Sequence, residues 1–148
     1  MVSRLNVSPK LSQYFTLAEM TVTLTGLLNQ PNAKQLERVK NTAKEMDRIR
    51  VVLGLPIRVT SCFRTSPVND AAGGSKTSDH LKGDACDFDC DRFGTPYEIC
   101  LAILQANIKF DQLIQEGGWV HISFGPKMRQ MTLTKTGPKK YKSGIHRS

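Results

Sequence analysis

The sequence predicts an α+β domain in which helices pack on one face of a small antiparallel sheet. One observation is an apolar stripe at helical spacing between residues 32 and 54, which is typical of an amphipathic helix. A second is that segments 84–89 and 119–124 alternate between apolar and polar side chains, as strands with one covered face do. We therefore expect helices over the apolar face of the sheet and chemistry on the polar face.

Each expected helix has recognisable end signals. Thr16 can cap a short first helix, and Glu19 completes its capping box. Asn32 can cap the long second helix, which Gly54 would end, and Pro96 suits the first turn of a third helix. The stripe of the long helix consists of Leu36, Val39, Ala43, Met46, Ile49 and Leu53. With 148 residues, the chain can bury one sizeable core.

The phase of the two strand segments separates apolar residues from polar ones. In the first segment Asp87 and Asp89 share one face, whereas Cys86 and Phe88 share the other. In the second segment His121 lies on the face opposite its apolar neighbours. Each strand therefore directs a possible metal ligand away from the face that packs on the helices.

Two imidazoles and one carboxylate make a candidate zinc site from His80, Asp87 and His121. Three such ligands with a fourth position left for water are typical of catalytic zinc, whereas structural zinc sites usually close with four protein ligands. His80 would lie on the loop that enters the first strand, and Gly83 would allow that loop to turn. The pattern favours metal-assisted hydrolysis.

Two other interpretations of these residues stay open. The histidines and the carboxylate could serve only packing and hydrogen bonding, without a metal. Alternatively, Asp87, Asp89, Asp91 and Glu98 fall at positions 1, 3, 5 and 12 of a calcium loop like that of an EF-hand. Arg92 argues against calcium because it stands where such a loop needs glycine.

A series of short motifs runs in order through about residues 12–125. The motifs are Ser61-Cys62-Phe63-Arg64-Thr65, Val68-Asn69, Gly73-Gly74-Ser75, the segment from Ser78 to Asp87, and Trp119-Val120-His121. In this series the chain resembles the zinc D-Ala-D-Ala peptidase family of bacterial cell walls and phages, and above all its short phage and prophage members. That family includes D-alanyl-D-alanine carboxypeptidases, dipeptidases and L-alanyl-D-glutamate endopeptidases.

The resemblance implies one zinc ion held by His80, Asp87 and His121. It also implies the fold shared by DD-peptidases and the signalling domain of Hedgehog proteins, so the same scaffold can exist without peptidase function. The expected function is a zinc-dependent peptidase that hydrolyses peptidoglycan stem peptides containing D-amino acids, like a phage endolysin. The alternative is a non-catalytic, zinc-containing module of a phage particle that binds the wall.

Peptide hydrolysis also needs a group that takes a proton from water and returns it to the leaving amine. Glu116 is the candidate, because Gly117 and Gly118 after it let the chain fold back toward His121. The resembling family often places its acidic base three residues before the last histidine, where this chain has Gly118. Glu116 could instead be a polar turn residue, and Asp89 is the second candidate for the base.

Arg64 is the candidate for contacting a substrate carboxylate during catalysis. It matches the arginine of the family's Ser-Gly-Tyr-Arg segment, with cysteine and phenylalanine in place of glycine and tyrosine. A guanidinium suits a carboxylate because its fork donates two charge-assisted hydrogen bonds. Ser75 and Ser78 could contact substrate or hold the loop of His80, and Trp119 could line the cleft or pack.

Positive charge is concentrated near the C-terminus of a chain whose net charge is +8. We expect a zinc peptidase domain over residues 1–128 and a basic extension over 129–148, with an edge strand at 129–134 and a mobile tail. The extension could attract anionic wall polymers or phospholipid surfaces. No recognised nucleic-acid-binding motif accompanies the charge, which disfavours nucleic acid as a partner. The basic residues after Glu116 are Lys127, Arg129, Lys135, Lys139, Lys140, Lys142 and Arg147, and no acidic residue follows it.

The remaining sequence features bear on the setting of the protein. No apolar run approaches the roughly 18 residues that suggest a membrane span, and the N-terminus lacks the apolar region of a secretory signal. We therefore expect synthesis in the cytoplasm without a signal peptide, and action at the wall after phage-type release or from a virion. The four cysteines are expected to be reduced, and the protein is expected to be a monomer.

Overall fold

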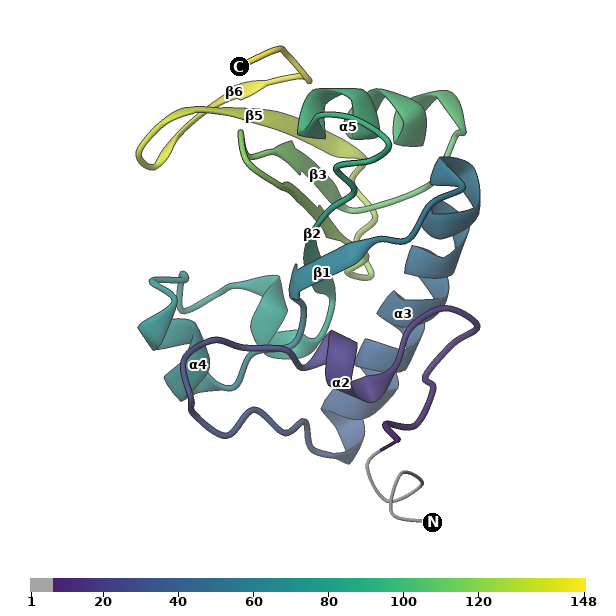
Figure 1. Cartoon of the computed structure of the whole chain (residues 1–148). Helices are drawn as coiled ribbons and strands as arrows, with labels where there is room; N and C mark the ends of the chain where they lie inside the picture. The colour runs from purple at the N-terminus through teal and green to yellow at the C-terminus, as the bar shows by residue number, and fades with distance from the viewer. Residues whose placement is uncertain (1–6) are drawn as a thin grey trace.

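The computed structural model of the protein describes residues 7–148, which form helices around one curved sheet (Figure 1). In the described residues a short helix and a long helix come first, and strands dominate the second half. The elements are α2 (Leu17–Met20), α3 (Ala33–Leu53), β1 (Arg58–Ser61), α4 (Ser66–Ala71), the 3-10 helix η1 (Asp79–Lys82), β2 (Ala85–Asp89), α5 (Pro96–Gln105), β3 (Gln112–Gln115), β4 (Val120–Ser123), β5 (Met131–Gly137) and β6 (Lys140–Ser143).

The α+β class predicted from the sequence is confirmed, but the sheet is mixed rather than wholly antiparallel. Its six strands lie in the order β1-β2-β4-β3-β5-β6, and β3 and β5 form the one parallel pair. The reason lies in the connection from β4 to β5, which passes the end of the sheet where β3 begins. Because β5 starts beside Gln112 at that end, it must run in the same direction as β3.

The helix ends follow the signals in the sequence. Thr16 caps α2, Asn32 caps α3, and each accepts a hydrogen bond from the backbone three residues on in a capping box. Gly54 ends α3 in the left-handed conformation, with φ of 70°. Pro96 occupies the first turn of α5, where its missing N–H costs no hydrogen bond. These local predictions are confirmed.

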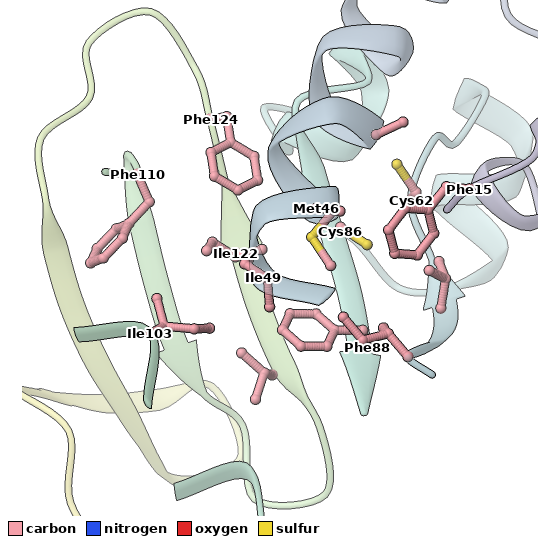
Figure 2. Packing of buried hydrophobic residues seen from close by; sticks show 14 of the residues in the cluster. Phe15, Met46, Ile49, Cys62, Cys86, Phe88, Ile103, Phe110, Ile122 and Phe124 are labelled. Carbon is pink, nitrogen blue, oxygen red and sulfur yellow. The ribbon is translucent and has the colours of Figure 1, made fainter. Parts of the chain in front are cut away.

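The core lies between the helices and one face of the sheet. Met46 and Ile49 of α3 pack among Cys86, Phe88 and Ile122 of β2 and β4, and all five side chains are fully buried (Figure 2). The strand phase expected from the sequence therefore holds, with the apolar face of β2 covered. All four cysteines are buried, and none forms a disulfide. No helix in residues 7–148 is both long and apolar enough to cross a membrane.

The expected edge strand of the C-terminal extension does not lie at the edge of the sheet, and the expected mobility of the tail stays a prediction. Residues 131–137 do form a strand, but β5 lies between β3 and β6, so β6 is the edge. The last residues then fold back on the sheet, because the amide of Gln115 donates to the carbonyl of His146 over 3.0 Å. The hairpin gives the free edge of β5 a strand partner. The proposed domain boundary at residue 128 stays a prediction.

An ion pair fixes the start of this extension. The backbone N–H of Arg129 and its Nε donate to Oδ1 of the buried Asp111 over 2.9 and 2.8 Å, and Nη2 donates to Oδ2 over 2.8 Å. Asp111 immediately precedes β3, and Arg129 lies shortly before β5. The pair therefore holds together the starts of the two parallel strands.

Candidate metal centre

Three side chains that lie far apart in the sequence meet on the polar face of the sheet. His80 comes from η1, Asp87 from β2 and His121 from β4, and one ligand atom of each lies within 4.8 Å of the others. Asp87 and His121 are paired across the two neighbouring strands, with Asp87 Oδ1 2.9 Å from His121 Nδ1. The other oxygen of Asp87 lies 3.3 Å from His80 Nε2. The chain thus folds the three predicted ligands into one cluster.

Local structure orients His80 toward the cluster. Ser78 caps η1 and accepts a hydrogen bond from the backbone N–H of His80 over 3.2 Å. On the ring, Nδ1 lies 2.6 Å from the carbonyl oxygen of Cys62, so it carries the proton and donates, and Nε2 is left as a ligand. Gly83 ends η1 with φ of 81°, which confirms that glycine provides the turn into β2. A Cβ at position 83 would also lie 2.7 Å from Val39 Cγ2.

The donor set suits zinc better than calcium. Two imidazole nitrogens and a carboxylate are ligands that zinc accepts, whereas calcium takes six to eight oxygen ligands. The calcium loop considered from the sequence also loses its second ligand, because Asp89 forms an ion pair with Arg58. Asp87 and Asp89 moreover lie on a regular strand rather than in a loop. We conclude that His80, Asp87 and His121 fit a zinc ion.

The electrostatics of the cluster favour a cation. Burial by itself would raise the pKa of Asp87, but the charge of His80 and the hydrogen bond from His121 lower it well below its usual range. Burial lowers the pKa of His121, yet the hydrogen bond to Asp87 and the nearby negative charges together outweigh this effect and raise the pKa. Asp87 is therefore an ionised carboxylate at neutral pH, as a metal ligand must be.

The cluster lies in a wide cleft of about 860 Å³. Every residue that the sequence singled out for catalysis, substrate binding or zinc binding lines this cleft except the second candidate base, Asp89. Asp89 is instead held by Arg58, whose Nε lies 3.1 Å from both of its carboxylate oxygens. The lining residues predicted from the sequence are Arg64, Ser75, Ser78, His80, Asp87, Glu116, Trp119 and His121.

Comparison with known proteins agrees with this geometry. A family model described as Peptidase M15 matches residues 13–123, which is most of the chain. The chain belongs to this family. No curated protein matches the sequence. Membership supports a metallopeptidase, and the zinc dependence of M15 peptidases agrees with the cluster of two histidines and one aspartate.

In this M15 peptidase, Arg64 lies beside the cluster and is nearly buried. Its Nη2 lies 3.4 Å from Asp87 Oδ2, Nε donates to Ser61 Oγ over 2.9 Å, and Nη1 donates to Asn69 Oδ1 over 3.2 Å. Gly74 permits this arrangement, because a Cβ there would lie 2.9 Å from Arg64 Nη1. Sequence reasoning quoted Asn69 and Gly74 only as part of motifs, and the structure shows that they position the guanidinium.

Glu116 lies in the turn between β3 and β4. Its backbone N–H donates to the carbonyl of Trp119 over 3.0 Å, and Gly117 takes φ of 95° to close the turn. Its half-buried carboxylate lines the cleft, and Oε1 accepts a hydrogen bond of 3.1 Å from the hydroxyl of Tyr141. The charge of Glu116 also contributes to raising the pKa of His121.

Sequence reasoning missed one side of the cleft. Five residues of the C-terminal extension line it, and all lie beyond the segment that the family model matches. The only available signal was the period of the segment 131–137, in which alternate residues share a face, and that period does not reveal which strand lies beside it. The missed residues are Arg129, Leu133, Lys135, Lys139 and Tyr141.

Proposed function

We propose that the protein is a zinc-dependent peptidase that hydrolyses peptide bonds in the stem peptides of bacterial peptidoglycan, at a bond that involves a D-amino acid. The observation that carries the proposal is the convergence of His80, Asp87 and His121 in a cleft that also holds an acidic and a basic side chain. Membership in the M15 family supports the peptidase class, and the resemblance to cell-wall enzymes supports the substrate.

His80, Asp87 and His121 would hold the zinc ion. Zinc in such a site acts as a Lewis acid that polarises a carbonyl and makes water a better nucleophile at neutral pH. We assign Glu116 as the general base: it takes a proton from the attacking water as the oxygen bonds to the carbonyl carbon. It then returns that proton to the amine nitrogen as the C–N bond breaks. The engagement of Asp89 by Arg58 supports this choice of base.

Arg64 would bind a carboxylate of the substrate. Hydrogen bonds to Ser61 and Asn69 restrict its guanidinium before substrate arrives, which lowers the entropy cost of binding. Ser75, Ser78 and Trp119 line the same cleft and would contact the peptide on either side of the scissile bond. Release of the enzyme in a phage-type infection, or its packaging in a virion, and a monomeric state remain proposals that rest on the resemblance.

Digestion of purified peptidoglycan tests the proposal, with mass spectrometry of the released fragments. Wild-type protein loaded with zinc should release new amines, and His121→Ala should not. Glu116→Ala should retain zinc but lose about 10²- to 10⁴-fold in kcat, the usual contribution of a general base. If zinc-loaded wild type releases no new amine, the non-catalytic wall-binding module replaces the peptidase. If Glu116→Ala keeps full activity, the assignment of the base is wrong.

A further inference from the structure

The β5–β6 hairpin forms one wall of the cleft. Lys135 and Tyr141 are paired across the two strands, so their side chains share a face, and both line the cleft with Lys139 from the turn. In Figure 1 the yellow hairpin and the teal loop after α4 lie on the same side of the molecule, and residues 72–79 of that loop line the cleft too. The hairpin thus lies across the cleft from part of the substrate-binding loop.

The two lysines bring uncompensated positive charge into this wall. Among residues 7–148, neither Lys135 nor Lys139 lies within ion-pair distance of a carboxylate, whereas Arg129 on the same wall is paired with Asp111. The ammonium of Lys135 lies 5.7 Å from the centre of the Trp119 ring, a cation–π contact that holds it at the cleft. Lys135 is half-buried, so solvent screens its charge less than at an open surface.

We propose that Lys135 and Lys139 form a second anionic subsite, which binds a substrate carboxylate other than the one at Arg64. This inference rests on the proposed peptidase function and narrows its substrate to peptides that carry two carboxylates. Arg64 offers a restrained fork beside Asp87, whereas the lysines offer point charges on flexible stems at the far wall. The two subsites would fix the position of an extended peptide between them.

The hairpin supplies its own matched control. Lys140 and Lys142 lie on the same strand as Tyr141 but alternate with it, and neither lines the cleft. Lys135→Gln with Lys139→Gln therefore changes net charge as much as Lys140→Gln with Lys142→Gln does. Only the first pair removes charge from the cleft. General attraction of an anionic ligand to the basic extension would be weakened equally by both pairs.

Calorimetry measures the subsite directly, with all variants made in a Glu116→Gln background to prevent turnover. The probes are the synthetic peptide L-Ala-γ-D-Glu-L-Lys-D-Ala-D-Ala and two analogues, each with one of its two carboxylates converted to the amide. Loss of Lys135 and Lys139 should weaken binding of the diacid about tenfold, as expected for a charged hydrogen bond. The same loss should hardly affect the analogue in which the carboxylate bound by the lysines has become an amide. The control pair should leave the ratio of the diacid's affinity to that of each amide unchanged.

The subsite is wrong if both lysine pairs weaken binding equally, or if the cleft pair weakens the diacid and both amides alike. Cleavage of the same diacid by protein with an intact Glu116 is measured separately. If that protein does not cleave but the lysine-dependent preference for the acid persists, the peptidase proposal fails and the subsite stands. If it cleaves and the preference is absent, the subsite alone fails.

A second inference rests on a different contact, the hydrogen bond from Tyr141 to Glu116. The hydroxyl of Tyr141 lies 3.1 Å from Glu116 Oε1 and belongs to the edge strand, beyond the family match. Burial, together with the neighbouring Glu116 charge, raises the pKa of Tyr141 to about 12, so the hydroxyl stays protonated and donates. We infer that Tyr141 is a positioning residue, which holds the carboxylate of Glu116 in the orientation that the reaction needs.

Tyr141→Phe removes this hydroxyl and keeps the ring. It should lower kcat about five- to tenfold with little change in KM, and zinc content should stay at the wild-type level. Tyr97→Phe, on α5, is the control and should change neither kcat nor KM. A fall in kcat that comes with loss of zinc or a matching rise in KM would reduce Tyr141 to a structural role. An unchanged kcat would overturn the inference.

Discussion

The two walls of the cleft are built in opposite ways. On the metal side, His80 and Asp87 are buried, Arg64 is nearly so, and the three are joined by hydrogen bonds to one another or to the backbone. On the hairpin side, Lys135 and Lys139 are half-buried or exposed and have no carboxylate partner among the described residues. We propose that the difference reflects a division of labour, with chemistry on the restrained wall and selection of the substrate by charge on the adaptable wall.

Asp87 and Asp89 provide the sharpest test of the metal side, because they share one strand face but have different neighbours. Asp87→Asn should abolish stoichiometric zinc binding and lower kcat/KM more than about a thousandfold, because a metal contributes several kcal/mol to such reactions. Asp89→Asn also removes one negative charge, but that charge is paired with Arg58, so this variant should retain zinc. Metal analysis after dialysis measures both variants. Equal zinc loss in the two would mean that general charge, and not the cluster, binds the ion.

Arg64 tests whether the restrained wall also recognises substrate. Arg64→Ala should lower kcat/KM by an amount that corresponds to about 2–3 kcal/mol of lost transition-state stabilisation, the range for losing a charged hydrogen bond. Its zinc content should stay intact. Arg64→Lys keeps the charge but loses the fork that Ser61 and Asn69 hold, so it should recover only part of the loss. Steady-state kinetics on the diacid peptide measures both variants. Full activity in Arg64→Ala would show that Arg64 does not bind the substrate carboxylate.

Gly83 tests how the backbone holds His80 on the metal side. Gly83→Ala places a Cβ at a φ of 81° and 2.7 Å from Val39 Cγ2, so we expect a loss of about 2–3 kcal/mol in the free energy of unfolding. The affinity for zinc should also fall, because η1 carries the ligand His80. Gly118→Ala meets nothing within 4 Å and serves as the control. Urea unfolding with and without zinc measures both effects, and equal stability of the two variants would contradict this account.

Local signals in the sequence predicted the helix caps, the turn and the strand phase that build the metal side. The caps at Thr16 and Asn32, the turn at Gly83, and the strand phase that pairs Asp87 with His121 each depend on a few neighbouring residues. The family resemblance then predicted which of these residues act together. The α+β class followed from the same local patterns.

The hairpin side could not be predicted in this way. Polar residues dominate 131–137, so periodicity alone could not show that β5 would lie beside β3 or run parallel to it. The roles of Lys135 and Tyr141 depend on that long-range pairing. Asp89 illustrates the same limit: its phase matches that of Asp87, yet it does not line the cleft and forms an ion pair with its strand partner Arg58.

The attachment of the hairpin gives the smallest expected effect. Asp111 and Arg129 join the starts of β3 and β5, and the hydrogen bond from Arg129 outweighs burial and lowers the pKa of Asp111. A lowered pKa means that this carboxylate stabilises the fold above its unfolded pKa of about 4, and that the contribution is lost as the pH falls below that value. Asp111→Asn should therefore lower the melting temperature by about 2–4 °C at pH 7, a small shift for a chain of this size, and the difference should be smaller at a pH of about 3.

Asp91→Asn is the matched control, because this exposed carboxylate makes no ion pair among residues 7–148. It should melt like wild type at both pH values. The zinc content of Asp111→Asn should stay at the wild-type level, whereas its affinity for the diacid peptide should fall, since a loosened hairpin carries Lys135 and Lys139 away from the cleft. A loss of zinc together with peptide affinity would show that the two walls are one structural unit and that their division of labour does not hold.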